Sequence, residues 1–127
     1  MRTVVAPMLC VSLLAGCRAK DTAPVMSHGQ PVFHWIEQLQ SSDAQTRKHA
    51  VAALGHVGAM DPAVIPALIG ALKDKDARVR DEAVLALLRI GPPAIDATSA
   101  LIEAERDPDA KVREHARKAL ERIQAKS

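Results

Sequence analysis

Aromatic residues are scarce in this 127-residue sequence, which has no tyrosine, one phenylalanine and one tryptophan. Alanine, leucine, valine and isoleucine must therefore supply the core, and this favours closely packed helices over a β-sandwich. The sequence also offers no aromatic platform on which single-stranded nucleic acid stacks. A charge excess of one sign is missing as well, since 17 basic and 15 acidic residues give a formal charge of +2. Without a basic stripe, the composition does not point to nucleic-acid binding.

Cysteine is nearly absent too, because Cys10 and Cys17 are the only two in the chain. Everything after residue 17 is free of thiols, which excludes a disulfide, a thiolate metal site or a cysteine nucleophile there. The sequence also contains no glycine-rich phosphate loop, nucleophile elbow or Ser/His/Asp grouping. These absences predict a protein that is not an enzyme and holds no cofactor.

The first residues, MRTVVAPMLCVSLLAGC, have the layout of a secretory signal peptide. Arg2 gives a short positive start and residues 4–15 form an apolar run that is too short to span a bilayer as a helix. The alternative is a buried N-terminal helix. The charged residues Arg18 and Lys20, which follow at once, argue against it.

The residues LAGC that end at Cys17 resemble the lipobox of bacterial lipoproteins. This resemblance implies that residues 1–16 are removed and that Cys17 carries several acyl chains, which together hold a protein stably to a membrane. Arg18 stands where an aspartate commonly retains such proteins at the inner membrane. We therefore expect a location in the bacterial cell envelope, with the outer membrane favoured if there are two. The folded part would face the periplasm or the exterior.

Residues 18–30 contain Pro24 and Gly29 and show neither a helical nor a strand period. We interpret residues 17–30 as the lipidated cysteine followed by a flexible tether.

A 33-residue repeat fills the rest of the chain. The phrases DAQTR at Asp43, DARVR at Asp76 and DAKVR at Asp109 are spaced 33 residues apart, since 76 − 43 and 109 − 76 both equal 33. Many apolar positions keep the same register, which marks a true repeat. The predicted organisation of residues 31–127 is three units at about 31–58, 61–91 and 94–124.

Each unit is predicted to be a helical hairpin. In the middle copy an apolar stripe from Ile65 to Leu72 predicts a first helix, and KDK forms a polar turn. Asp76 is placed to cap the second helix, which ends at Gly91, and Asp43 and Asp109 are placed to cap the equivalent helices of the other copies. One such hairpin cannot bury its own stripe, whereas three stacked hairpins can.

The phrase D-x-x-V-R-x-x-A-x-x-A-L-x-x-I-G, complete from Asp76 to Gly91, resembles the second helix of HEAT-like repeats in the short form found in phycobilisome-lyase-type proteins. The resemblance covers about residues 31–124. It implies an all-α fold, a right-handed α-solenoid whose second helices line a concave surface. It also implies a structural ladder in which a repeated arginine pairs with the turn aspartate of an adjacent unit. The residues of this ladder are Asp43, Arg47, Asp76, Arg80, Asp109 and Arg113.

The lyase-type relatives attach bilin pigments to other proteins, but they are much longer, and a chain with two aromatic residues offers a poor pigment pocket. The last copy places Glu105, Arg117 and Glu121 where earlier copies are apolar or glycine, which suits an end repeat whose flank meets water. We therefore expect the solenoid to end there, with three units.

The five histidines do not form a metal motif. His28 is in the predicted tether, and His34 is near the start of the first helix. His49 and His56 are two helical turns apart, about 10 Å, which is too far to share one ion. His115 aligns with His49 but lies two repeats away. The sequence predicts no metal site.

A candidate partner-binding surface lies on the outward side of the second helices. On a helical wheel centred on Ala83, leucines point outward and basic side chains surround them, as a protein-binding patch requires. The alternative is that neighbouring helices partly cover the leucines. The predicted surface consists of Arg78, Glu82, Leu85, Leu88, Arg89, Lys118 and Arg122.

These observations predict a non-enzymatic scaffold or adaptor, anchored as a lipoprotein, that binds another protein through an acidic or apolar segment. Two alternatives remain open: an accessory or cofactor-handling subunit related to the lyase-type proteins, and a purely structural packing element.

Overall fold

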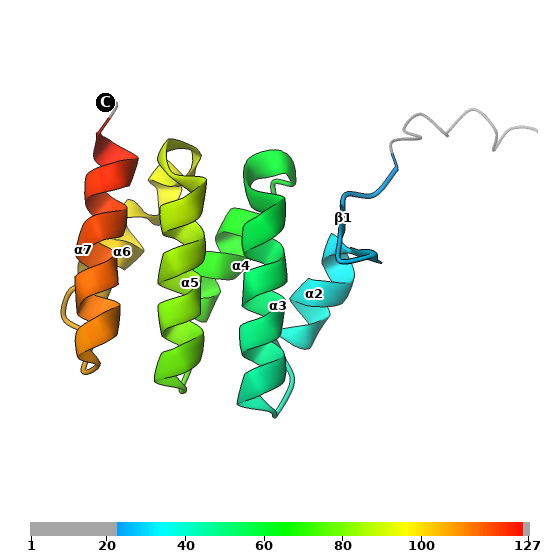
Figure 1. Cartoon of the computed structure of the whole chain (residues 1–127), viewed down its shortest axis with the longest axis horizontal. Helices are drawn as coiled ribbons and strands as arrows, with labels where there is room; N and C mark the ends of the chain where they lie inside the picture. Colours follow the sequence, from blue (N-terminus) through cyan, green and yellow to red (C-terminus); the bar gives the residue numbers. More distant parts are fainter. Residues whose placement is uncertain (1–22, 126–127) are drawn as a thin grey trace, which may run out of the picture.

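The computed structural model describes residues 23–125, which form a small β-hairpin followed by alternating short and long helices (Figure 1). The predicted signal peptide (1–16), Cys17 and residues 18–22 lie outside the described residues. The hairpin pairs β1 (Met26–Ser27) antiparallel with β2 (Gln30–Pro31). The helices are α2 (Val32–Gln38), α3 (Ala44–Val57), α4 (Val64–Ala71), α5 (Ala77–Ile90), α6 (Thr98–Ala104) and α7 (Ala110–Gln124), with 3₁₀ turns η2 (Gly58–Met60) and η3 (Pro92–Ala97).

The helices form two layers. The long helices α3, α5 and α7 stand side by side, while α4 and α6 lie behind them and α2 lies beside α3 in Figure 1. Within the long layer α3 packs on α5 and α5 packs on α7. This arrangement confirms the all-α solenoid of helical hairpins that the repeat predicts.

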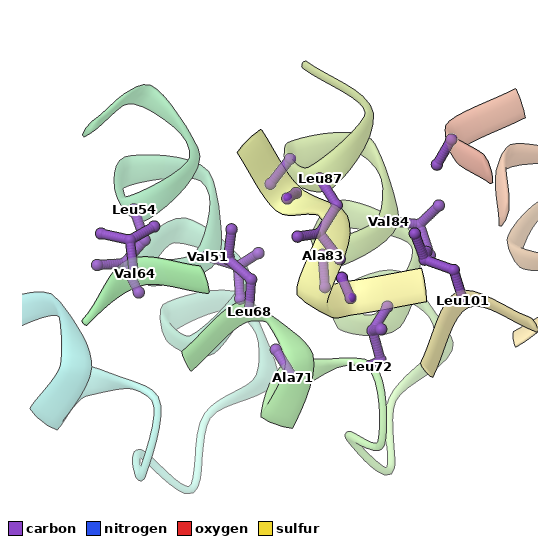
Figure 2. Packing of buried hydrophobic residues seen from close by; sticks show 14 of the residues in the cluster. Val51, Leu54, Val64, Leu68, Ala71, Leu72, Ala83, Val84, Leu87 and Leu101 are labelled. Carbon is purple, nitrogen blue, oxygen red and sulfur yellow. The ribbon is translucent and has the colours of Figure 1, made fainter. Parts of the chain in front are cut away.

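The core lies between the two layers (Figure 2). Leu54 and Leu87 from the long helices and Leu68 and Leu101 from the short ones are fully buried. Each such leucine contributes about 1.5–3 kcal/mol relative to an exposed one. Small residues set the distance between the long helices, because a Cβ added at Gly55 would lie 2.8 Å from the Cβ of Ala86.

The hairpin corrects one prediction. Residues 18–30 were expected to be a flexible tether, but Met26–Ser27 and Gln30–Pro31 form two paired strands, and β1 packs against α3. The buried hydroxyl of Ser27 donates to the Ala53 carbonyl at 2.8 Å, and Trp35 Nε1 donates to the Ser27 carbonyl at 3.0 Å. Two-residue strands are too short to produce a detectable period, so the sequence pattern missed them.

At the other end of the solenoid, Arg117 and Glu121 are exposed, as expected for a flank in contact with water. Within residues 23–125 no helix combines the length and the apolar composition needed to cross a bilayer.

Candidate protein-binding face

The three long helices begin in the same way. Asp43 accepts from the Thr46 N–H at 2.9 Å, Asp76 from the Arg78 N–H at 2.8 Å, and Asp109 from the Lys111 N–H at 2.8 Å. These bonds confirm the predicted caps, each of which stabilises its helix by about 1 kcal/mol. Because α3, α5 and α7 start in one register, their outward side chains align in rows across the face they form, which we call the long-helix face.

The arginine ladder exists, but its acidic partners differ from the prediction. Arg47 does not pair with a capping aspartate. It donates from Nε and Nη2 to Asp74 at 2.8 and 3.0 Å, and Arg80 donates to Asp107 with the same two distances. The reason is that the capping carboxylates are occupied by helix N–H groups. Asp74 and Asp107, each two residues before a capping aspartate, face the preceding repeat instead.

The third arginine of the ladder has no carboxylate partner among residues 23–125. Arg113 Nη1 donates instead to the carbonyls of Asp107 and Pro108, at 2.7 and 3.0 Å. Arg47 and Arg80 each make a comparable carbonyl bond, to Ser41 and Asp74 at 2.8 Å. The ladder therefore joins each repeat to the next by a bidentate ion pair, and it is structural in character.

Asp74 and Asp107, the carboxylate partners of Arg47 and Arg80, remain ionised although both are partly buried. Burial raises the pKa of Asp74, but hydrogen bonds from Arg47 and from the Asp76 N–H outweigh it and hold the pKa below its ordinary value. Burial also raises the pKa of Asp107, but hydrogen bonds from Arg80 and from the Asp109 N–H outweigh this effect, and the pKa lies below its ordinary value. A carboxylate held in this way adds stability above its ordinary titration range.

The predicted partner-binding residues all lie on the long-helix face, but they differ in exposure. Arg78, Arg89, Lys118 and Arg122 are exposed, while Glu82 is half-buried. Arg78 is anchored by the capping Asp76, to which its Nη2 donates at 2.8 Å. The Arg89 guanidinium lies 3.5 Å from Glu82, and Lys118 lies 2.9 Å from Glu114.

The leucines of the predicted patch are not fully exposed. Leu85 and Leu88 are both half-buried, and Leu88 packs against the core. The helical wheel treated α5 as an isolated helix, whereas α3 and α7 flank it on both sides. Of the two alternatives that the sequence left open, the structure therefore shows the one in which neighbouring helices partly cover these leucines. Among the described residues, the large exposed apolar side chains are Met26, Phe33, Met60, Ile95 and Ile102.

A shallow groove of about 440 Å³ crosses the N-terminal halves of all three long helices. Leu85 and Glu82 form part of it, and its basic side chains are Lys48 of α3, Arg78 of α5 and Lys111 of α7. Its full lining is Lys48, Ala77, Arg78, Asp81, Glu82, Leu85, Asp109, Ala110 and Lys111.

One link across this face was missed by the sequence reasoning. His115 Nδ1 of α7 lies 2.6 Å from Oδ1 of Asp81 on α5, and both side chains are half-buried. Asp81 and His115 are 34 residues apart, one residue more than a repeat, which is the signal that could have identified them. His115 thus connects α7 to α5.

Known structures place this architecture in context. The chain aligns over 83% of its length with the complex of CpcE and CpcF of phycocyanin lyase from Nostoc sp., with a TM-score of 0.66 and 30% identity. Human deoxyhypusine hydroxylase in complex with glycerol aligns over 74% with a TM-score of 0.62 and 29% identity. The crystal structure of an engineered protein aligns over 74% with a TM-score of 0.63 and 25% identity.

The chain spans less than half the length of these structures: 40% of the lyase chain, 32% of the hydroxylase and 45% of the engineered protein. No curated protein matches its sequence. The family model for HEAT repeats matches residues 33–121, most of the described solenoid. With its capped helical hairpins, its bidentate ladder and this match, the chain belongs to the HEAT-repeat family.

Proposed function

We propose that this chain is a non-enzymatic scaffold that binds another protein on its long-helix face. The observation that supports the proposal most directly is the groove that crosses α3, α5 and α7, because a segment lying in it would contact all three repeats at once. No single repeat offers such a surface. Recognition of this kind needs side chains that the packing does not already use.

The groove contains as many acidic as basic side chains, but each of its acids has a partner: Asp81 faces His115, Glu82 faces Arg89, and Asp109 caps α7. An acidic partner segment would therefore meet the cations of the groove. The exposed cations Arg78 and Lys111 line it, and Lys118 lies two helical turns further along α7. The half-buried Leu85 in its lining provides a small apolar contact. Opposite charges across an interface speed association and select partners, while the apolar contact contributes affinity. The proposed partner is therefore a protein with an acidic segment that carries a few apolar side chains.

The experiment is affinity capture from detergent-solubilised bacterial envelope. A Lys111→Glu, Lys118→Glu double variant reverses charge on the face. A Lys73→Glu, Arg106→Glu double variant makes the same charge change at exposed turn residues away from the groove. We expect the wild type and the turn variant to capture the same protein and the face variant to lose it. Equal capture by both variants, or no specific capture by the wild type, contradicts the proposal.

We also propose that the protein is held in the bacterial envelope by lipid at Cys17, with the outer membrane favoured where two membranes exist. The lipobox-like residues that end at Cys17 support this. A Cys17→Ser variant should lose its acyl groups in mass spectrometry and leave the membrane fraction. If the Cys17→Ser protein stays in the membrane fraction unacylated, the anchor proposal fails.

A second candidate, an accessory subunit of a lyase-type enzyme, is favoured by one observation, the alignment with the phycocyanin lyase complex over 83% of the chain. Such a role requires a small-molecule pocket. The groove between α2 and α4, about 290 Å³ and lined by Ile36, Leu39, Ala67 and Gly70 among others, is a partly apolar candidate for such a pocket. A thermal-shift screen with tetrapyrroles separates the two functions, because the scaffold proposal predicts no shift.

A further inference from the structure

The hairpin brings three histidines together that are distant in the sequence. The ring of His28, in the turn between β1 and β2, has its centre 5.3 Å from that of His56 and 5.9 Å from that of His49, both on α3. All three side chains are exposed. His49 and His56 are two helical turns apart and cannot share an ion directly, but His28 is close to both of them.

The position of His28 is fixed by its surroundings. His28 and Gly29 have φ of 51° and 77°, so the chain reverses tightly at this point. The preceding residue, Ser27, is buried and bonded to Ala53 of α3, while Trp35 donates to the Ser27 carbonyl. The hydrogen bonds of Ser27 and the tight turn therefore hold His28 close to α3.

These separations suit a pair of imidazole ligands. A metal ion lies 2.0–2.1 Å from a ligating histidine nitrogen, which puts the ring centre about 3 Å from the ion. Two ligating rings then have centres roughly 5–6 Å apart at ligand angles near tetrahedral or somewhat wider. Both histidine pairs fall in this range, and the His28–His56 pair fits the tetrahedral value better.

We propose that His28 and His56 form a binding site for a transition-metal dication of the class that imidazole prefers. The separation of the two rings matches the tetrahedral geometry of Zn²⁺, and Cu²⁺, which binds imidazole more tightly, serves as the probe. Imidazole nitrogen suits copper, nickel and zinc, and divalent affinity is highest for copper. Among residues 23–125 no group of three or more His, Cys, Asp or Glu side chains is arranged to hold an ion. The site is therefore a two-histidine chelate whose other ligands are water, which the exposure of both rings permits.

The affinity should be moderate. Only two protein ligands contribute, whereas structural sites use four. A cation also lies nearby, because the Arg89 guanidinium rests against Gly55, the residue before His56. We expect half-saturation at micromolar Cu²⁺. The site is independent of the proposed protein-binding groove, since the lining of that groove includes neither histidine.

Trp35 provides a direct readout. It is the only tryptophan in the chain, and its ring centre lies 6.1 Å from that of His28 and 5.2 Å from that of His49. Bound Cu²⁺ quenches indole fluorescence at such short range. The titration uses the full chain with Cys10→Ser and Cys17→Ser, which removes both thiols. We expect saturable quenching by one equivalent of Cu²⁺, reversed by a chelator, and an electron paramagnetic resonance spectrum with two imidazole nitrogens.

The variants identify the ligands. His28→Asn preserves the turn, because asparagine tolerates positive φ, and it should raise the half-saturation concentration at least tenfold. His56→Ala, on an exposed helix position, should do the same. His34→Ala is the matched control, since His34 lies 4.9 Å from Trp35 but is not a proposed ligand, and it should leave the titration unchanged.

Circular dichroism confirms that each variant is folded before the titration. Absence of saturable quenching in the wild type, or equal half-saturation in the wild type, His28→Asn and His56→Ala, overturns the proposal. If His49→Ala weakens binding and His56→Ala does not, the assignment of His56 is wrong. If His28→Asn does not fold, His56→Ala decides the question by itself.

Discussion

The bidentate pair between Arg47 and Asp74 should be a major contributor to the stability of the solenoid. Its side chains are only 6% and 13% exposed, so neither charge recovers its hydration when the partner is removed. Arg47→Met keeps the length of the side chain but deletes two bonds to Asp74 and one to the Ser41 carbonyl. Removing one partner of a buried ion pair typically costs about 3–5 kcal/mol.

We expect the lower end of that range, about 3 kcal/mol, because Asp74 still accepts from the Asp76 N–H at 2.8 Å. For a domain of this size that corresponds to a fall in Tm of about 10–20 °C. The measurement is urea denaturation followed by circular dichroism, on the wild type, Arg47→Met, Asp74→Asn and the double variant. The double variant should be less destabilised than the sum of the single ones by about 1–3 kcal/mol.

Arg113→Met is the internal control, because Arg113 occupies the same repeat position but bonds only to carbonyl groups. Its loss should cost about 1 kcal/mol. If Arg47→Met costs as little as Arg113→Met, and the cycle shows no coupling, the pair acts like an exposed surface ion pair. In that case the argument that the ladder joins the repeats is refuted.

Three further predictions concern the same framework. In thermal unfolding, Gly55→Ala should lower the free energy of unfolding by about 1–2 kcal/mol, because the added Cβ would lie 2.8 Å from Ala86 of α5. Gly70→Ala should raise it by about 0.5–1 kcal/mol, because nothing lies within 4 Å of the added Cβ and alanine favours the helix. Asp43→Ala should cost about 1 kcal/mol through loss of its cap, while Asp43→Asn should cost less in the same assay. Folding lowers the pKa of Asp74 and of Asp107, so their contribution to stability is present above about pH 4 and is lost as the pH falls through the folded pKa values. Acid titration should therefore destabilise the wild type more steeply than an Asp74→Asn, Asp107→Asn variant.

The sequence predicted the features that recur with the 33-residue repeat, such as the starts of the long helices. The starts of α3, α5 and α7 follow from one aspartate recurring every 33 residues, and each capping bond is local, within three residues. The predicted end of α5 at Gly91 is equally local, because Gly91 has a φ of 72°. Such features need no knowledge of the neighbouring repeat, and they were predicted correctly.

Contacts between repeats were predicted less well. Asp74 and Asp76 are both candidates for Arg47 in the sequence, and only the geometry of the cap shows that the second is already used. The sequence did contain a signal, since Asp74 and Asp107 also recur at an interval of 33. The sequence left the exposure of Leu85 and Leu88 open for a related reason: it depends on the flanking helices α3 and α7, which a wheel drawn for one helix leaves out.

The histidine cluster shows where a repeat period stops being informative. His49 and His56 belong to the repeat, and their seven-residue spacing predicts that they act separately. His28 belongs to the hairpin, which occurs only once among the described residues. The hairpin is positioned by two hydrogen bonds of Ser27, one to the Ala53 carbonyl and one from Trp35, and the repeat pattern predicts neither. Positions that the stacking uses in every copy are committed to structure. Recognition is therefore to be sought where copies differ, as at His56, Arg89 and Arg122, or where a segment that does not repeat rests on one that does.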